Sequence, residues 1–237
     1  MAEDPAFKEE WKEGVYRAIH QRRDVRAQFL PDPIDEAALA RILLAAHHAP
    51  SVGFMQPWDF LLVRDLETRR KVRAAFEAAH QAEAGTLPPD RREAYFKLKL
   101  EGILESPLNL CVTCDRSRLG ELRLGRTAQP EMDRYSAVCA VQNLWLAARS
   151  EGIGVGWVSI VDPEVLKGIL GIPPAIEVIA YLCVGRVSRF PERPDLEVAG
   201  WASRLPIESL VRVERWEDRL DGRWPELSKA LAGRKKA

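Results

Sequence analysis

Apolar residues at helical spacing predict several amphipathic helices. Asp4 and Pro5 are typical of a helix start, because aspartate caps the first turn and proline is tolerated there. The apolar residues that follow recur every four positions: Phe7, Trp11, Val15 and Ile19. Further helices are predicted over residues 35–49, which Pro50 follows, and over residues 68–84.

The helical pattern over residues 131–150 is apolar on nearly every side. Its apolar positions are Val138, Cys139, Ala140, Val141, Leu144, Trp145, Ala147 and Ala148. Gly152 follows its end, as is common after a helix. A helix of this kind needs burial all round, so we expect it to lie in the core of a dimer.

Short apolar runs predict the strands of a sheet. They cover residues 60–63, 108–114, 154–160 and 176–187. The third run is punctuated by glycine. Together with the helices, these strands predict a mixed domain of helices and strands.

Two segments fit neither a simple helix nor a strand. Residues 85–107 contain a double proline and apolar side chains within strongly charged sequence, which we interpret as a mobile helical lid. An ordinary surface hairpin of helices is the alternative. Residues 188–237 are rich in proline and arginine yet still apolar, so we expect this tail to wrap around a partner subunit. With no repeat or linker in the sequence, we expect one domain over residues 1–237.

Composition and charge limit the possible partners. A chain of 237 residues with 46% hydrophobic content can bury a sizeable core. Basic and acidic residues both number 35, so no overall field attracts nucleic acid or an anionic membrane. The first twenty residues match neither a cleavable signal nor a membrane span. We expect a soluble cytoplasmic protein that binds neither nucleic acid nor membranes.

The four cysteines all lie in apolar runs. Cys111 and Cys114 form a C-x-x-C motif, but in a predicted strand two positions three apart face opposite sides. We therefore interpret them, with Cys139 and Cys183, as reduced core thiols rather than as a dithiol or zinc site. His47 and His48 end a helix and are interpreted as core or capping residues, so no metal site is expected.

Charged side chains crowd the segment after the first helix. Arg22, Arg23 and Arg26 surround Asp24 and Val25. Guanidinium groups offer forked donors that match the oxygens of a phosphate monoester. The segment is therefore a candidate phosphate site, and a solvated basic surface is the alternative.

Four motifs in sequence order resemble those of the nitroreductase family. They are the arginine pair at 22–23, Ala-Pro-Ser leading to Gln-Pro-Trp at 49–58, the glycine-rich strand at 154–160, and Ser-Arg-Leu-Pro at 203–206. In that family these motifs bind FMN at a homodimer interface. The resemblance covers roughly residues 10–215. It implies an α+β, nitroreductase-like fold with a central, mostly antiparallel sheet flanked by helices and a C-terminal extension around the partner.

Two positions depart from ordinary members of the family. Such members carry a serine after the arginine pair and an asparagine two residues before the glutamine, where this chain has Asp24 and Phe54. The departures resemble one branch of the family, the 5,6-dimethylbenzimidazole synthases. The segments that carry this resemblance are residues 22–26, 51–58, 99–103, 111–115 and 156–160.

The resemblance assigns catalysis to Asp24 and Ser159. Asp24 would be a base for proton removal after dioxygen has reacted, and Ser159 would place its hydroxyl near the central ring of the flavin. A salt bridge to Arg23 or Arg26 is the alternative for Asp24. A hydrogen bond to the backbone is the alternative for Ser159.

The same resemblance implies a set of flavin-binding residues. We expect the arginines to hold the phosphate and polar edges, the loop at 50–53 to reach the flavin from the other subunit, and Leu100 to approach from the lid. The full set is Arg22, Arg23, Asp24, Val25, Arg26, Pro50, Ser51, Gly53, Leu100, Ser159 and Arg204.

The activity implied by the resemblance is oxygen-dependent fragmentation of reduced FMN. The products would be 5,6-dimethylbenzimidazole, the lower ligand of cobalamin, and erythrose 4-phosphate. Because Phe54 adds bulk where relatives are polar, we expect little room for nicotinamide and a separate flavin reductase that supplies reduced FMN as the substrate. Dioxygen would be the co-substrate. The alternatives are an NAD(P)H-dependent nitro- or quinone reductase with bound FMN, and a non-catalytic flavin-binding or storage protein.

Overall fold

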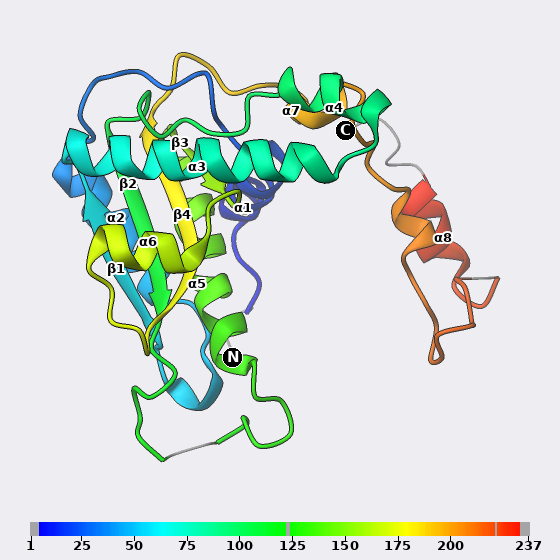
Figure 1. The fold of residues 1–237 in the computed structure, drawn as a ribbon. Coiled ribbons are helices and arrows are strands. Elements are labelled where there is room, and N and C mark those ends of the chain that lie inside the picture. Colours follow the sequence, from blue (N-terminus) through cyan, green and yellow to red (C-terminus); the bar gives the residue numbers. More distant parts are fainter. Residues whose placement is uncertain (1–4, 122–123, 221, 233–237) are drawn as a thin grey trace. The chain divides into compact units, whose positions relative to one another are not determined.

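The computed structural model describes residues 5–121, 124–220 and 222–232. The chain divides into two units, Met1–Pro194 and Asp195–Ala237 (Figure 1). The first unit holds the sheet and most of the helices, and the second unit holds the C-terminal segment. The two are described separately below.

The sheet of the first unit has four strands in the order β1-β2-β4-β3. They are β1 (Trp58–Val63), β2 (Leu108–Cys114), β3 (Ile153–Val158) and β4 (Glu177–Arg186), and every neighbouring pair is antiparallel. The predicted α+β class with an antiparallel sheet is confirmed. β3 also forms an isolated parallel bridge with the chain before it, between Asp24 and Val155.

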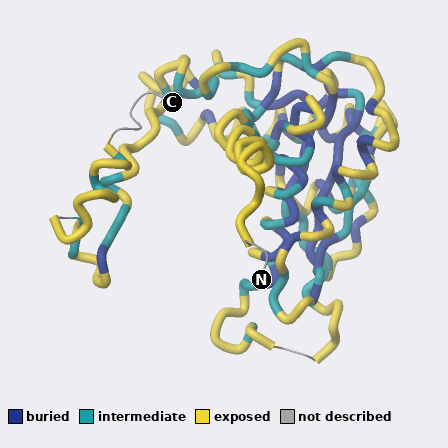
Figure 2. The backbone as a smooth tube through the Cα atoms, turned by 180° about the vertical axis from the view of Figure 1, so that it is seen from behind, coloured by how far each residue is buried: buried dark blue, intermediate teal, exposed yellow. Residues whose placement is uncertain are grey.

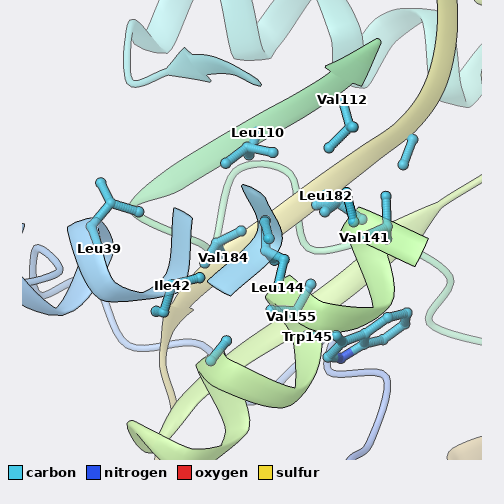
Figure 3. Packing of buried hydrophobic residues seen from close by; sticks show 14 of the residues in the cluster. Leu39, Ile42, Leu110, Val112, Val141, Leu144, Trp145, Val155, Leu182 and Val184 are labelled. Atoms are coloured by element: carbon cyan, nitrogen blue, oxygen red, sulfur yellow. The ribbon is translucent and has the colours of Figure 1, made fainter. Parts of the chain in front are cut away.

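One face of the sheet is covered by α2 (Glu36–His47) and α5 (Met132–Ser150). Asp35 caps α2 by accepting a hydrogen bond from the backbone of Ala38 at 3.0 Å, as its sequence position predicts. Figure 3 shows the side chains of both helices packed against those of β2, β3 and β4. Because α5 contacts the sheet, α2 and α1, much of its apolar surface is buried within one subunit. Tyr135 and Val138 remain exposed.

The other face is covered by α3 (Leu66–Thr86) and α6 (Pro163–Leu170), which lie over the side of the sheet turned to the viewer in Figure 1. Cys111 belongs to the core on this face, whereas Cys114 belongs to the core on the opposite face. Both are buried free thiols, and burial is the main reason that the pKa of each is raised to about 12. The interpretation of this motif as core thiols is confirmed.

Helix α1 (Glu9–Gln21) begins later than the sequence predicts. Its N-cap is Lys8, Pro5 precedes the helix, and Asp4 lies outside the described residues. No residue of α1 is buried, so tertiary packing does not extend its first turn towards the N-terminus. Figure 2 shows the helix exposed along its length. The predicted apolar positions are among its exposed residues, with Trp11 57% and Val15 48% exposed.

The predicted lid contains one helix, α4 (Pro89–Phe96), and an irregular segment that leads into β2. Tyr95 is buried against α3, where its ring centroid lies 4.7 Å from that of His80. Arg92 donates hydrogen bonds to the carbonyl groups of Ala84, Gly85 and Leu87 between the two helices. The lid is thus attached to α3 by aromatic packing and by backbone contacts. Its mobility remains a prediction.

The described residues of the second unit, 195–220 and 222–232, form three short helices. They are α7 (Asp195–Val198), the 3-10 helix η2 (Ile207–Ser209) and α8 (Pro225–Ala232). Arg212 and Arg219 donate hydrogen bonds to the carbonyl of Ser209, which joins η2 to the following turn. Its apolar side chains include Leu205 and Trp216, which are 64% and 78% exposed. The expectation that this segment wraps around a partner remains a prediction.

Candidate functional site

The segment that follows α1 lies along the outer edge of β3. The backbone N–H of Val25 donates to the carbonyl of Val155 at 3.0 Å. Asp24 Oδ1 accepts a hydrogen bond from the backbone N–H of Trp157 at 3.0 Å. Arg26 donates to Asp24 Oδ2, so the predicted salt bridge is present. The carboxylate is therefore fixed on both oxygens, with 30% of the side chain still exposed.

Glycine in β3 allows this close approach. A Cβ atom at Gly156 would lie 2.1 Å from the carbonyl oxygen of Val25. A Cβ atom at Gly154 would lie 2.4 Å from the side chain of Val187. Both contacts are shorter than real Cβ atoms make, so the glycine pattern that marks the strand in the sequence is required by the packing of Val25 and Val187 against β3.

Ser159 follows the last residue of β3 and is exposed. The sequence predicts a strand that continues to Ile160, but β3 ends at Val158. Asp162 caps α6 and Pro163 begins it, so the chain must leave the sheet before that helix. Ser159 is thereby presented at a strand end, two positions along the chain from the amide that holds Asp24.

The predicted phosphate arginines have unequal surroundings. The guanidinium of Arg22 lies 4.6 Å from the ring centroid of Trp145. Arg23 donates to the carbonyl groups of His20 and Arg22, and also to that of Glu192. The Nε atoms of Arg23 and Arg26 are buried without a hydrogen-bond partner. Each of these two side chains thus retains one unused donor.

Arg149 at the end of α5 joins this cationic group, and the sequence analysis missed it. Its guanidinium donates to the backbone and side chain of Gln21. Burial, together with the positive charges of Arg17 and Arg23, lowers the pKa of Arg149. Within the described part of the chain, Arg17, Arg23 and Arg149 form no salt bridge with a carboxylate. Like charges gathered in this way favour an anionic ligand.

The end of the lid reaches the same region. Leu100 packs against the hydrophobic cluster that includes Val25 and Val158. Gly102 is buried, and a Cβ atom there would lie 2.7 Å from the carbonyl oxygen of Arg26. The structure therefore brings the lid, the Asp24 segment and β3 together, as the site prediction requires.

The loop that contains Pro50, Ser51 and Gly53 has a constrained backbone. The φ angles of Gly53, Phe54 and Gln56 are 55°, 53° and 50°, in the left-handed region that non-glycine residues rarely adopt. The backbone N–H of Gln56 donates to Ser51 Oγ at 3.1 Å, which helps to hold this shape. Phe54 is consequently 82% exposed.

This loop lies far from the Asp24 segment within one subunit. It includes the 3-10 helix η1 (Val52–Phe54) and leads into β1, whereas Asp24 lies against β3. β1 and β3 form opposite edges of the sheet, about three strand spacings or roughly 14 Å apart. One subunit therefore does not unite the two predicted parts of the site. Arg204 belongs to the second unit and is described only within it.

Other candidate chemistries find no support in the described residues. No group of three or more potential metal ligands occurs among them. His48 is the C-cap of α2, and its Nδ1 lies 2.8 Å from the carbonyl oxygen of Leu44. His47 is exposed and accepts a hydrogen bond from Trp58 Nε1 at 3.3 Å, so it is not a core residue. None of the described helices is long and apolar enough to cross a membrane.

The sheet of the first unit thus lies between two helical layers, and arginines and a carboxylate gather at its edge strand β3. The model of the Nitroreductase family matches residues 19–186, and the chain belongs to this family. It is 43% identical over 206 residues to a 5,6-dimethylbenzimidazole synthase of Rhodospirillum rubrum, covering 87% of this chain and 97% of the relative. The identity to a relative of the same name from Rhodobacter capsulatus is 38% over 202 residues, covering 85% and 97%.

A solved structure of similar fold is that of an iodotyrosine deiodinase bound to FMN and 3-iodo-L-tyrosine. The match covers 86% of this chain and 98% of the other, with a TM-score of 0.66 and 21% identity. At that identity the likeness concerns the fold alone. The nitroreductase-like fold and the resemblance to the 5,6-dimethylbenzimidazole synthases are thereby confirmed.

Proposed function

We propose that this protein is a 5,6-dimethylbenzimidazole synthase that fragments reduced FMN with dioxygen. The observation that carries the proposal is the fixed carboxylate of Asp24 beside β3, in a chain 43% identical to a relative of that name. Ordinary family members have a hydroxyl at this position. The second product would be erythrose 4-phosphate, which retains the phosphate of FMN.

The residues around Asp24 fit a phosphate-bearing aromatic ligand. The cationic group formed by Arg22, Arg23, Arg26 and Arg149 has the charge to hold a phosphate dianion, and two of these side chains have an unused buried Nε donor. The apolar cluster under Leu100 offers a surface for a flat ring. The family resemblance also assigns a phosphate contact to Arg204.

Bound reduced FMN would supply the electrons that activate dioxygen. Asp24 would accept a proton from the ligand, since its carboxylate remains partly exposed beside β3. Ser159, exposed at the end of β3, would donate to or accept from the central ring. The lid, through Leu100, would exclude water from the reacting atoms.

The complete site would require two subunits. Because the loop at residues 50–53 lies at the opposite edge of the sheet from Asp24, it would contact flavin only across a homodimer interface. Phe54 projects from this loop and would occupy space over the flavin that nicotinamide needs in a conventional reductase. A separate flavin reductase would therefore supply the reduced substrate.

The decisive experiment is a product analysis. The purified protein is incubated with FMN, an unrelated flavin reductase, NADH and air, and the small molecules are separated and identified by mass. We expect 5,6-dimethylbenzimidazole that is absent when either the protein or dioxygen is omitted. When the added reductase is omitted, NADH should be consumed more slowly than in the complete mixture.

The alternative function, that of an NAD(P)H-dependent reductase, makes opposite predictions. Such an enzyme retains FMN as a yellow prosthetic group and oxidises NADH without help. A flavin-consuming enzyme should be purified largely colourless. Yellow protein that oxidises NADH and forms no 5,6-dimethylbenzimidazole would overturn the proposal, and bound flavin without any turnover would indicate a storage protein.

A further inference from the structure

A buried carboxylate, that of Glu101, lies in the last part of the lid. Its side chain is only 3% exposed. Oε1 lies 2.7 Å from Lys99 Nζ and 3.4 Å from Arg73 Nε of α3. Oε2 accepts a hydrogen bond from the backbone N–H of Ile103 at 2.7 Å. A buried carboxylate remains charged only when ion pairs and hydrogen bonds of this kind compensate for its burial. Removal of its charge leaves Lys99 and Arg73 without the partner that they share.

The two neighbours of Glu101 in the chain contact the candidate site. Leu100 packs against the cluster of Val25 and Val158. Gly102 approaches the carbonyl of Arg26 so closely that a side chain has no room. The position of the Glu101 carboxylate therefore determines how these neighbours meet the Asp24 segment.

The segment at residues 99–103 contacts α3 in two ways. Ile103 is buried in the hydrophobic cluster that includes Val72 and Phe76 of α3. Glu101 instead meets α3 through its ion pair with Arg73. A cavity of about 560 Å³ lies between α3 and the lid segment, with Arg73, Lys99, Leu100 and Glu101 among its lining residues. Where a cavity separates two elements, fewer van der Waals contacts hold them together. The ion pairs of Glu101 then contribute a larger share of the attachment.

We infer that Glu101 is a positioning residue, which anchors residues 99–103 to α3 and so holds Leu100 over the reacting part of the ligand. This inference rests on the proposed function and adds a residue to it. Glu101 itself does not touch the ligand. Its effect is to keep the lid end closed while reduced FMN reacts, so that the flavin is fragmented rather than simply reoxidised.

The chain offers two matched control carboxylates. Lys99 also pairs with Glu105, which is 42% exposed, and Arg73 also pairs with Glu77, which is 60% exposed. Each control shares a cation with Glu101 but is not buried in the lid. Glu105→Gln and Glu77→Gln therefore remove the same kind of charge without removing the buried anchor.

The test measures how reduced FMN is partitioned between two fates in air. Fragmentation yields 5,6-dimethylbenzimidazole, whereas simple reoxidation converts reduced FMN and dioxygen to FMN and hydrogen peroxide. Both products are quantified after one turnover with the folded protein in excess over reduced FMN, so that little unbound flavin reoxidises in solution. In Glu101→Gln we expect the ratio of 5,6-dimethylbenzimidazole to peroxide to fall at least about tenfold, because a misplacement of about 1 Å can cost about 10²-fold in rate. Both controls should keep the wild-type ratio.

With the concentration of folded protein matched between variants and kept above that of the flavin, the ratio reports the fate of bound flavin, so a loss of folded protein alone leaves it unchanged. An unchanged ratio in Glu101→Gln overturns the inference, as does an equal fall in the two controls. If Glu101→Gln is recovered only as aggregate, Lys99→Gln tests the same anchor from its cationic side. If the ratio of 5,6-dimethylbenzimidazole to peroxide falls further in Lys99→Gln than in Glu105→Gln, the inference is supported. Equal ratios in these two variants overturn it. Wild-type protein that forms no 5,6-dimethylbenzimidazole would instead refute the proposed function.

Discussion

At the scale of single residues, Asp24 combines a structural and a chemical role. One oxygen accepts from the amide of Trp157 and the other from Arg26, so the carboxylate joins the segment after α1 to β3. From the sequence, a salt bridge and a catalytic base are alternative roles for Asp24. The contacts allow both, since the side chain is paired with Arg26 and is still 30% exposed.

Substitution of Asp24 by asparagine separates these roles. In Asp24→Asn the side-chain oxygen can still accept from Trp157, whereas the base is lost. We expect reduced FMN to bind with similar affinity and the formation of 5,6-dimethylbenzimidazole to fall about 10²–10⁴-fold. Affinity is measured anaerobically, and product yield is measured at saturating reduced FMN. Weak binding with nearly normal cleavage would instead leave Asp24 as a residue that only orders the arginine segment.

The sequence identified the residues near Asp24 because local motifs carry them. The charged segment at 22–26 and the glycines of β3 are each contiguous, and the structure pairs them directly. Arg149 and Glu101 could not be found in this way. Arg149 approaches the cluster only because α5 ends beside α1, and Glu101 is one acidic residue in a strongly charged stretch until packing buries it. Such roles arise from tertiary contacts, which spacing along the chain does not reveal.

At the scale of elements, the sequence predicts the bounds of some helices and strands better than those of others. The bounds of β2 agree with the sequence prediction because every residue of the run is buried. The start of α1 and the end of β3 differ from the sequence prediction. No residue of α1 is buried, so its start is set by local capping. β3 ends where its pairing ends, because the chain then turns into α6. Patterns of hydrophobicity thus predict buried elements better than exposed ends.

Gly156→Ala tests the close approach at β3. The added Cβ atom would meet the carbonyl oxygen of Val25 at 2.1 Å, so the backbone must move. We expect a loss of about 1–3 kcal/mol in the free energy of unfolding, measured by urea denaturation. Gly168→Ala is the control, because a Cβ atom there meets nothing within 4 Å and alanine favours the helix α6. Equal stability of the two variants would refute this account of the strand.

A buried ion pair holds the loop before α5. The side chain of Asp133 is 1% exposed and accepts from Arg116 Nε at 2.9 Å. Burial alone would raise the pKa of Asp133, but hydrogen bonds from Arg116 and from the backbone of Arg134 outweigh it and lower that pKa. A lowered pKa in the folded state stabilises the protein above the unfolded value of about 3.9. This stability is lost as the pH falls through the folded pKa.

The prediction is therefore a pH-dependent difference between wild type and Asp133→Asn. At pH 7 the variant should lose about 1.5–3 kcal/mol of unfolding free energy, because the hydrogen bonds from Arg116 and Arg126 lose their charged acceptor. Below a pH of about 4, protonation of Asp133 in the wild type should make the two proteins more alike. Urea midpoints across this range provide the measurement. A difference that stays constant with pH would exclude Asp133 as the titrating group.

At the scale of the whole molecule, the proposed site and the exposed apolar surface both require a second subunit. The Asp24 segment and the loop at 50–53 lie at opposite edges of one sheet. Trp11 and Val15 of α1 are exposed although they are the apolar positions of an amphipathic helix. Specific dimers bury about 1,600 Å² in total, and a continuous helical stripe is a suitable contribution to such an interface.

We therefore expect a homodimer whose dissociation weakens flavin binding. Sedimentation velocity at micromolar concentration should give a dimer for the wild type and a monomer for Trp11→Glu combined with Val15→Glu, because two carboxylates would be buried without partners. The monomer should bind reduced FMN more weakly, since it lacks the loop of the other subunit. Val165→Glu is the control, because this valine is 45% exposed, much like Val15, but lies on α6 rather than on α1. A monomeric wild type, or a monomeric variant with unchanged FMN affinity, would show that one subunit forms the site alone.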